Sequence, residues 1–139
     1  MVHALKEVWR VLVPRGSLID LRPLAFNPPI EVIADGKVLG SGVVVDGSLR
    51  VPDDVASEAA LQKVIDDGCF VCERTMSFEC ALYWDTIEEM RADAKNWQRW
   101  RLPADSALAE VHQLMARTTG EARVRVRRPM VIARYRRAP

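Results

Sequence analysis

Apolar residues recur along this chain at helical and strand spacings and divide it into a series of elements. Leu5, Val8, Trp9 and Leu12 lie three or four residues apart, which predicts an amphipathic helix that Pro14 ends. Ser17 to Leu21 is a short apolar run, typical of a strand covered on both faces. The later patterns predict a hairpin over about 30–45 that turns at Asp35-Gly36, and helices over about 55–67, 83–100 and 106–118. They also predict a strand over about 70–78 and a last strand over about 123–136, which Pro129 divides.

Length and composition are those of one globular domain. The chain has 139 residues, of which 49% are hydrophobic and 28% charged, and its formal net charge is +1. A balance this close to neutral provides no general attraction to nucleic acid or to a membrane surface. No apolar run approaches the roughly 20 residues that a membrane helix needs. Three cysteines, with no signal-peptide pattern before them, favour reduced thiols and a cytoplasmic protein.

Three segments, in order, resemble the class I S-adenosylmethionine-dependent methyltransferases. They read RVLVPRGSLIDLRP near the N-terminus, ALQKVIDDGCFVC in the middle and PMVIARYRR near the C-terminus. The first is similar to a piece that this family carries in the middle of its domain, with the wording ALxExxRVLxPGGxLxxxDxRP. It departs from that wording at Arg15, where glycine is usual.

The resemblance implies that residues 1–139 form a single domain equivalent to the C-terminal half of the methyltransferase domain. The expected fold is α/β and partly Rossmann-like, a mixed sheet of about three main strands plus a β-hairpin, flanked by helices. The last strand would lie antiparallel between the first strand and the strand over 70–78. The hairpin over about 30–46 and a helical segment over about 83–103 would be insertions.

The cofactor-binding half of that family carries a glycine-rich loop between a strand and a helix. The glycines of this chain cluster instead in DGKVLGSGVVVDG, inside the expected hairpin, where turns and a bulge account for them. We therefore expect no catalytic residue, no cofactor-binding residue and no activity in the isolated chain. S-adenosylmethionine would bind only where a complementary N-terminal half is present.

A metal site is not expected from the cysteines. Cys69 and Cys72 form a CxxC, but CFVC lies in an expected strand, where residues three apart point to opposite faces. A zinc site needs a fourth ligand beyond these two and Cys80. We expect three buried or partly buried thiols.

Five residues are candidates for the substrate side of a complete domain. Asp20 and Arg22 lie at the carboxyl end of the first strand, the edge at which open α/β sheets bind ligands, although a salt bridge between them is the simpler interpretation. Trp84, Trp97 and Trp100 fall in the second insertion. They would shape an aromatic pocket, or, more simply, pack helices or an oligomer interface.

Alternating arginines at 123, 125 and 127 would place three guanidinium groups on one strand face, opposed in the local sequence only by Glu121. Such a face tracks phosphates, or marks a protected edge strand; the near-neutral net charge makes nucleic acid the less favoured partner.

Two function classes remain: part of a small-molecule methyltransferase that pairs with a separate cofactor-binding half, and a non-catalytic module that self-associates. Because the first strand and one face of the first helix would lack cover, we expect a homodimer.

Overall fold

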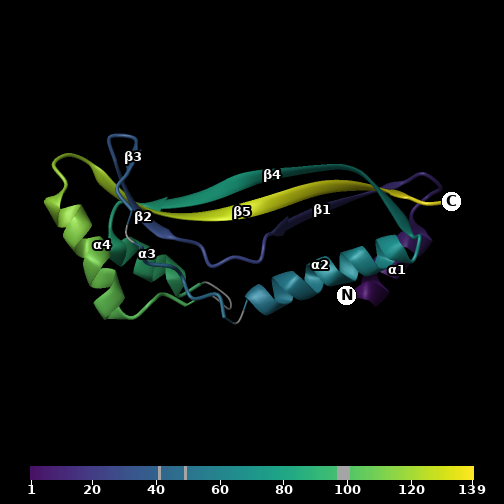
Figure 1. The fold of residues 1–139 in the computed structure, drawn as a ribbon, viewed down its shortest axis with the longest axis horizontal. Helices are drawn as coiled ribbons and strands as arrows, with labels where there is room; N and C mark the ends of the chain where they lie inside the picture. The colour runs from purple at the N-terminus through teal and green to yellow at the C-terminus, as the bar shows by residue number, and fades with distance from the viewer. Residues whose placement is uncertain (41, 49, 97–100) are drawn as a thin grey trace. The chain divides into compact units, whose positions relative to one another are not determined.

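The computed structural model describes residues 1–40, 42–48, 50–96 and 101–139. Within them the fold is α/β, with four helices and a five-stranded antiparallel sheet (Figure 1). In chain order the elements are α1 (Val2–Val11), β1 (Ser17–Pro23), β2 (Ile30–Ala34), β3 (Lys37–Val38), α2 (Val51–Asp66), β4 (Phe70–Trp84), α3 (Ile87–Ala94), α4 (Asp105–Arg117) and β5 (Ala122–Arg137).

The chain divides into two compact units. The first unit contains Met1–Ala25, Pro52–Phe78 and Pro129–Pro139, and the second contains Phe26–Val51 and Glu79–Arg128. Strands β4 and β5 each contribute one part to both units. Each unit is described separately below.

The sheet of the first unit has β5 between β1 and β4. β1 pairs with β5 in antiparallel register from Ser17 opposite Arg136 to Pro23 opposite Met130. β4 also pairs with β5. The expected neighbours of the last strand are therefore confirmed. The expected mixed sheet is wrong, because the returning strand β5 separates β1 from β4 and leaves neither with a parallel neighbour among the described residues.

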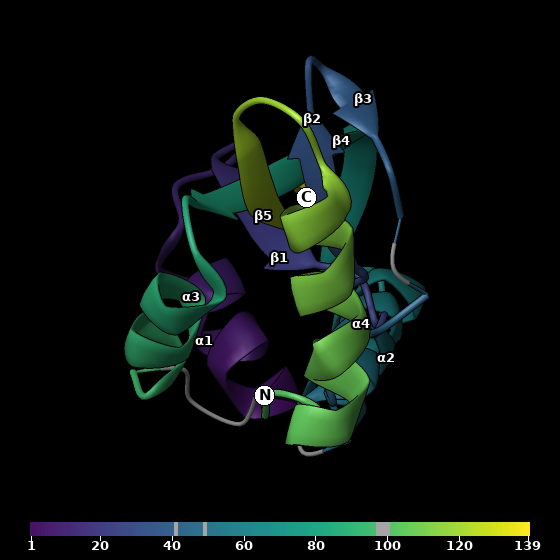
Figure 2. The ribbon, with the colours of Figure 1, turned by 90° about the vertical axis from the view of Figure 1, so that its left-hand side faces the viewer.

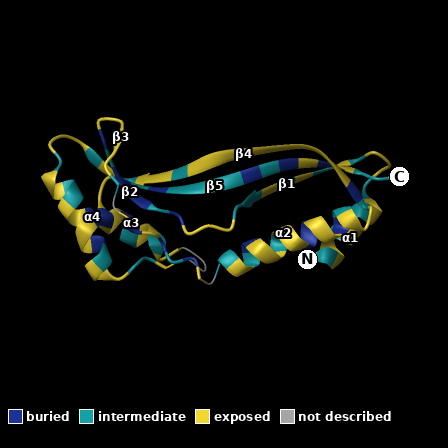
Figure 3. Ribbon diagram, viewed as in Figure 1, coloured by how far each residue is buried: buried dark blue, intermediate teal, exposed yellow. Residues whose placement is uncertain are grey.

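Helices α1 and α2 cover one face of this sheet. Leu61 and Val64 of α2 are buried with Phe70, Ala133 and Tyr135. The apolar stripe of α1 packs against this cluster as its helical spacing predicts, through Val2, Leu5, Val8, Trp9 and Leu12. Every residue of α1 keeps some exposure, so the helix is half-buried (Figure 3).

The expectation that β1 is covered on both faces is wrong. Leu18 packs on the core, whereas Ile19 and Leu21 point to the other face and are 56% and 58% exposed. Their partners across the ladder, Arg134 and Ile132, share that outer face. In the first unit no described helix covers it.

The second unit begins with the expected hairpin. Asp35 and Gly36 both have positive φ, 49° and 71°, which is the geometry of the two-residue turn that Asp-Gly favours. The returning arm is shorter than expected, since β3 ends at Val38. Gly40 and Gly42 also have positive φ, so the arm leaves the ladder and rejoins it at Val43, whose carbonyl accepts from the N–H of Ile30 at 2.9 Å.

The core of the second unit lies between β2, β5, α3 and α4. Its fully buried members include Ile30, Val32, Met90, Val111 and Val124. β2 pairs with β5 from Ile30 opposite Val126 to Ala34 opposite Ala122. Figure 2 shows α4 of this unit and the short connection that leads from it into β5.

The helix expected over 83–100 is wrong at its start. Tyr83 and Trp84 belong to the end of β4, and α3 begins only at Ile87. The reason is a cap: the Thr86 hydroxyl accepts from the N–H of Glu89 at 3.1 Å, and the Glu89 carboxylate accepts from the N–H of Asp85 at 2.9 Å. The N-terminal half of the expected apolar face is confirmed, because Ile87 and Met90 are buried. Its last member, Trp97, lies outside the described residues.

Two other boundaries differ from expectation. α2 begins at Val51, so Asp53 lies in its first turn instead of capping it. β5 runs through Pro129 without a break. The buried positions of β5 are even-numbered up to Val126 and odd-numbered from Val131, and Pro129 lies where this phase changes, an irregular position of the kind that tolerates a residue without an N–H.

Candidate functional site

Asp20 and Arg22 form an ion pair in the first unit. Arg22 Nε lies 2.9 Å from Asp20 Oδ2, and its terminal nitrogen is 3.8 Å from Glu58 Oε1 of α2. Across the ladder they face Ala133 and Val131, both buried, so the pair belongs to the helix-covered face of the sheet. Both side chains are mostly buried. The salt bridge between the two residues, which was the simpler interpretation, is confirmed.

Tyr135 is a polar member of this corner that the sequence analysis did not identify. It lies opposite Leu18 in the ladder and is buried in the apolar cluster. Burial raises the pKa of its phenol above the usual value, and the charges of Asp20 and Glu58 add to the shift. The corner therefore holds a neutral hydroxyl beside a partly buried ion pair.

Of the three tryptophan candidates, the structure describes Trp84 alone. Trp84 packs on the apolar core of the second unit as a partly buried side chain. Trp97 and Trp100 lie outside the described residues. The described part of the cluster therefore supports the packing interpretation of Trp84.

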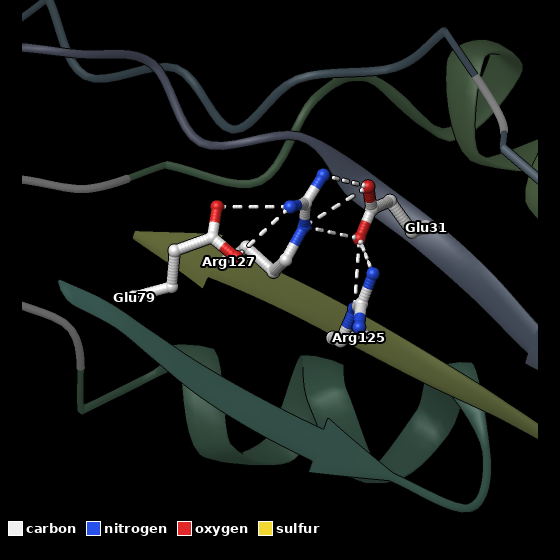
Figure 4. A network of polar contacts seen from close by, with 4 residues as sticks. All are labelled: Glu31, Glu79, Arg125 and Arg127. Atoms are coloured by element: carbon white, nitrogen blue, oxygen red, sulfur yellow. Dashed lines mark hydrogen bonds and ion pairs between the residues drawn. The ribbon is translucent and has the colours of Figure 1, made fainter. Parts of the chain in front are cut away.

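A polar cluster of four charged residues lies in the second unit, on β2, β4 and β5 (Figure 4). Glu31 of β2 is buried, with 6% of its surface exposed. Its carboxylate accepts from Arg125 Nε at 2.8 Å and from Arg127 Nη2 at 2.7 Å. Arg127 also donates through Nη1 to Glu79 of β4 at 2.9 Å. Two arginines and two glutamates thus form a network that is balanced in charge.

The protonation states of this network follow from its hydrogen bonds. Burial alone would raise the pKa of Glu31, but the hydrogen bonds from Arg127 and Arg125 outweigh it and hold the pKa below its ordinary value. The hydrogen bonds to Glu31 and Glu79 raise the pKa of Arg127. Glu31 is therefore ionised at neutral pH and is no candidate for a general acid.

Acidic side chains from other parts of the chain compensate several arginines of β5. Arg123 pairs with Asp85 at 2.7 Å and lies over the ring of Tyr83, 5.6 Å from its centroid. Arg134 and Arg136 both reach Glu73, each at 3.1 Å. The expectation that only Glu121 opposes this segment is therefore wrong, because the compensating charges come from distant parts of the sequence. β5 is also a central strand, so the edge-strand interpretation is wrong as well.

The sequence interpretation did not include this network, because it considered the arginines of the last strand and not Glu31. Glu31 is the one charged residue in the apolar strand IEVIA, and a lone acid there is expensive to bury without a cationic partner. The alternation Arg-Val-Arg-Val supplies that partner on one face, while Val124 and Val126 enter the core on the other. The lone acid in IEVIA and the alternating arginines of the last strand together predict that these two strands pair and that Glu31 forms ion pairs with the arginines.

The cysteines differ from expectation in their exposure. Cys69 lies in the turn before β4 and is partly buried, but Cys72 and Cys80 on β4 are exposed, because nothing in the described chain covers that part of the strand. All three are free thiols. In the residues that the structure describes, no group of three or more histidine, cysteine or acidic side chains is placed to hold a metal ion.

The glycines of DGKVLGSGVVVDG lie where hairpin turns need them. Gly36, Gly40 and Gly42 all have positive φ, and a Cβ added at any of them would meet no neighbouring atom within 4 Å. They serve backbone conformation in and after the β2–β3 hairpin, not close approach to another group.

None of the helices in the described ranges is long and apolar enough to cross a membrane. Comparison of the chain with known protein families, with characterised proteins and with solved structures finds no match.

Proposed function

We propose that this chain is a methyltransferase-like α/β module, equivalent to the part of the domain that follows the cofactor loop. One observation carries the proposal. The strand order β1–β5–β4 of the first unit, with the last strand running antiparallel to β1 between it and β4, is the arrangement that the resemblance implies.

Local structure supports the same assignment. In RVLVPRGSLIDLRP, helix α1 leads through the Arg15-Gly16 turn into β1, and in ALQKVIDDGCFVC, helix α2 leads through Gly68 into β4. Arg15 has a φ of 62°, a left-handed conformation that glycine adopts at least cost. The position at which the sequence departs from the family's wording is thus one where glycine fits the backbone best.

In this proposal the isolated chain is not catalytic, and S-adenosylmethionine binds only after a cofactor-binding half joins it. The free edge of β1 is the place for that half. Among the described residues β1 pairs only with β5, and beside this edge Ile19 and Leu21 expose more than half of their surface. The Asp20–Arg22 pair then belongs to the scaffold on the opposite, helix-covered face.

An association experiment tests the proposal. The protein segment encoded immediately upstream of Met1 is co-expressed with the tagged chain, and co-purification is measured for the unchanged chain and for Leu21→Lys. We expect the segment to co-purify with the unchanged chain and to be lost with Leu21→Lys. An upstream segment without a strand, glycine loop and helix, or one that ignores the substitution, would refute the proposal.

The second candidate is a non-catalytic module that self-associates. The exposed Ile19 and Leu21 favour it too, because exposed apolar side chains beside an unpaired strand edge mark an association surface. Nucleic-acid binding through β5 has less support, since Arg123, Arg125, Arg127, Arg134 and Arg136 are all in ion pairs within the chain.

A further inference from the structure

A different strand edge gives a surface that neither proposal above uses. β4 is 15 residues long and, among the described residues, pairs only with β5, so its other edge has no strand partner. The ten residues 71–80 are all exposed. Three of them are large and apolar: Val71, Met76 and Phe78, with 47%, 55% and 41% of their surface exposed.

This edge lacks the features that usually keep a strand from pairing with another chain. Natural edges are commonly short, or carry proline, lysine or a bulge. β1 is short, with seven residues, and ends at Pro23. β4 is twice as long and contains no proline, glycine or lysine. Glu73, which could protect it, is drawn to Arg134 and Arg136 of β5.

The order of residues along this edge suits a second copy of the same strand. Residues 72–80 read CERTMSFEC, with Met76 at the centre, Cys72 and Cys80 at the two ends, and Glu73 and Glu79 next to them. Two copies related by a two-fold axis pair as antiparallel strands, and each contact then occurs twice. A sequence that reads nearly alike in both directions places similar residues opposite each other.

We propose that β4 is the self-association edge of this protein and that two copies pair in antiparallel fashion about Met76. In this register Met76 meets Met76 of the second copy, Thr75 meets Ser77, and the guanidinium of Arg74 lies opposite the ring of Phe78. Hydroxyl pairs, apolar pairs and cation–ring pairs all stabilise directly opposed positions of a sheet.

The charges permit this register. Glu73 would lie opposite Glu79, which is unfavourable for two free carboxylates. Each is already compensated within its own chain, Glu73 by Arg134 and Arg136 at 3.1 Å and Glu79 by Arg127 at 2.9 Å. A register centred on Arg74 would instead place Arg74 opposite Arg74 of the second copy, and within the described part of the chain no acidic side chain is recorded in an ion pair with it.

The register also places Cys72 opposite Cys80 of the second copy. Opposed residues of antiparallel strands have Cα atoms about 4.5 to 5.5 Å apart, within the range that a disulfide spans. Both thiols are free and exposed, and Cys72 Sγ lies 3.3 Å from the hydroxyl of Thr75. The native cysteines are therefore reporters of the pairing.

The first test is the oligomeric state of the full chain with reductant present. Sedimentation velocity over a concentration series is compared for the unchanged chain, Met76→Lys and Leu21→Lys. The two substituted side chains have nearly equal exposure, 55% and 58%, so each variant should fold, which circular dichroism verifies. We expect a dimer that Met76→Lys weakens by more than about tenfold in Kd, because two like charges meet at the axis, while Leu21→Lys leaves it unchanged.

The second test reads the register. Mild oxidation with dithiodipyridine, followed by peptide mass spectrometry, should yield a Cys72–Cys80 link between two copies. A monomer at every concentration, a dimer that only Leu21→Lys disrupts, or a link confined to Cys69 would overturn the proposal. Because the proposed cofactor-binding half docks at β1, Met76→Lys should still bind the upstream segment, and the two proposals fail separately.

Discussion

At the scale of single residues, Glu31 has the largest expected effect on stability. Its carboxylate is buried and is held by Arg125 and Arg127. Replacing it with glutamine keeps the shape but leaves Arg125 without its carboxylate and Arg127 with Glu79 alone, so we expect a loss of about 2 to 3 kcal/mol in the free energy of unfolding at neutral pH. The matched control is Glu79→Gln, which is 60% exposed and should cost less than about 1 kcal/mol. Urea denaturation measures both, and equal losses would contradict the assigned roles.

The same carboxylate makes stability depend on pH. Since the pKa of Glu31 is lower in the folded chain than its ordinary 4.5, the ionised form stabilises the fold at every pH above that value. This stabilisation is lost as the pH falls below 4.5 and through the folded-state pKa. The difference in unfolding free energy between the unchanged chain and Glu31→Gln should therefore be constant near neutral pH and shrink in acid. A difference that grows as the pH falls would show that the carboxylate is not stabilised as described.

Arg15 carries a backbone cost that a single substitution removes. Its φ of 62° is unfavourable for a residue with a Cβ. Arg15→Gly should raise the free energy of unfolding by about 0.5 to 1 kcal/mol, the relief being partly offset by the greater freedom of glycine in the unfolded chain. Arg15→Ala serves as the control and should be nearly neutral, because alanine keeps the Cβ. Thermal unfolding distinguishes the two, and a destabilised Arg15→Gly would contradict the assigned conformation.

At the scale of elements, the start of α3 depends on Thr86. Its hydroxyl accepts from the N–H of Glu89, one of the unpaired donors at the helix N-terminus. Thr86→Ala should destabilise the chain by about 1 kcal/mol, and Thr86→Ser should restore most of the loss because serine caps equally well. Hydrogen exchange at the first turn of α3 should rise in the alanine variant alone. An unchanged exchange rate would place the helix start elsewhere.

Elements with a local signal were predictable from the sequence. The helix of Leu5, Val8, Trp9 and Leu12 and the Asp-Gly turn agree with the structure. The neighbours of the last strand agree as well, but they were expected from the family resemblance and not from a local pattern. Thr86-x-x-Glu89 is also a local signal, a capping pattern that fixes the helix start, whereas apolar periodicity alone extends the helix back to Tyr83.

Features that depend on distant partners were not predictable in this way. Whether Ile19 and Leu21 are covered depends on which element lies over the outer face of β1, and the sequence pattern of β1 itself contains no information about that. Likewise, the arginines of β5 looked unopposed because Glu31, Glu73 and Glu79 reach them from other strands. The Asp20–Arg22 pair was predictable because both partners lie on one strand face, two residues apart.

At the scale of the whole molecule, two strand edges that have no partner among the described residues are assigned different roles. The edge of β1 is proposed for a cofactor-binding half, and the edge of β4 for a second copy of the chain. The β4 assignment involves the Glu79–Arg127 pair of the polar network, whereas Glu31 itself is buried in the second unit and contributes to its stability. Substitutions at Leu21, Met76 and Glu31 should therefore affect three separate properties: association with the other half, self-association and stability.

The measurement that tests the central claim most directly is calorimetric titration with S-adenosylmethionine. The ligand is titrated into the purified 139-residue chain, and into the same chain joined to the segment encoded upstream of it. We predict no binding heat from the chain alone and stoichiometric binding by the joined protein, because the glycine-rich cofactor loop between a strand and a helix must come from the other half. Stoichiometric, micromolar binding by the chain alone, or none by a folded joined protein, would contradict the account.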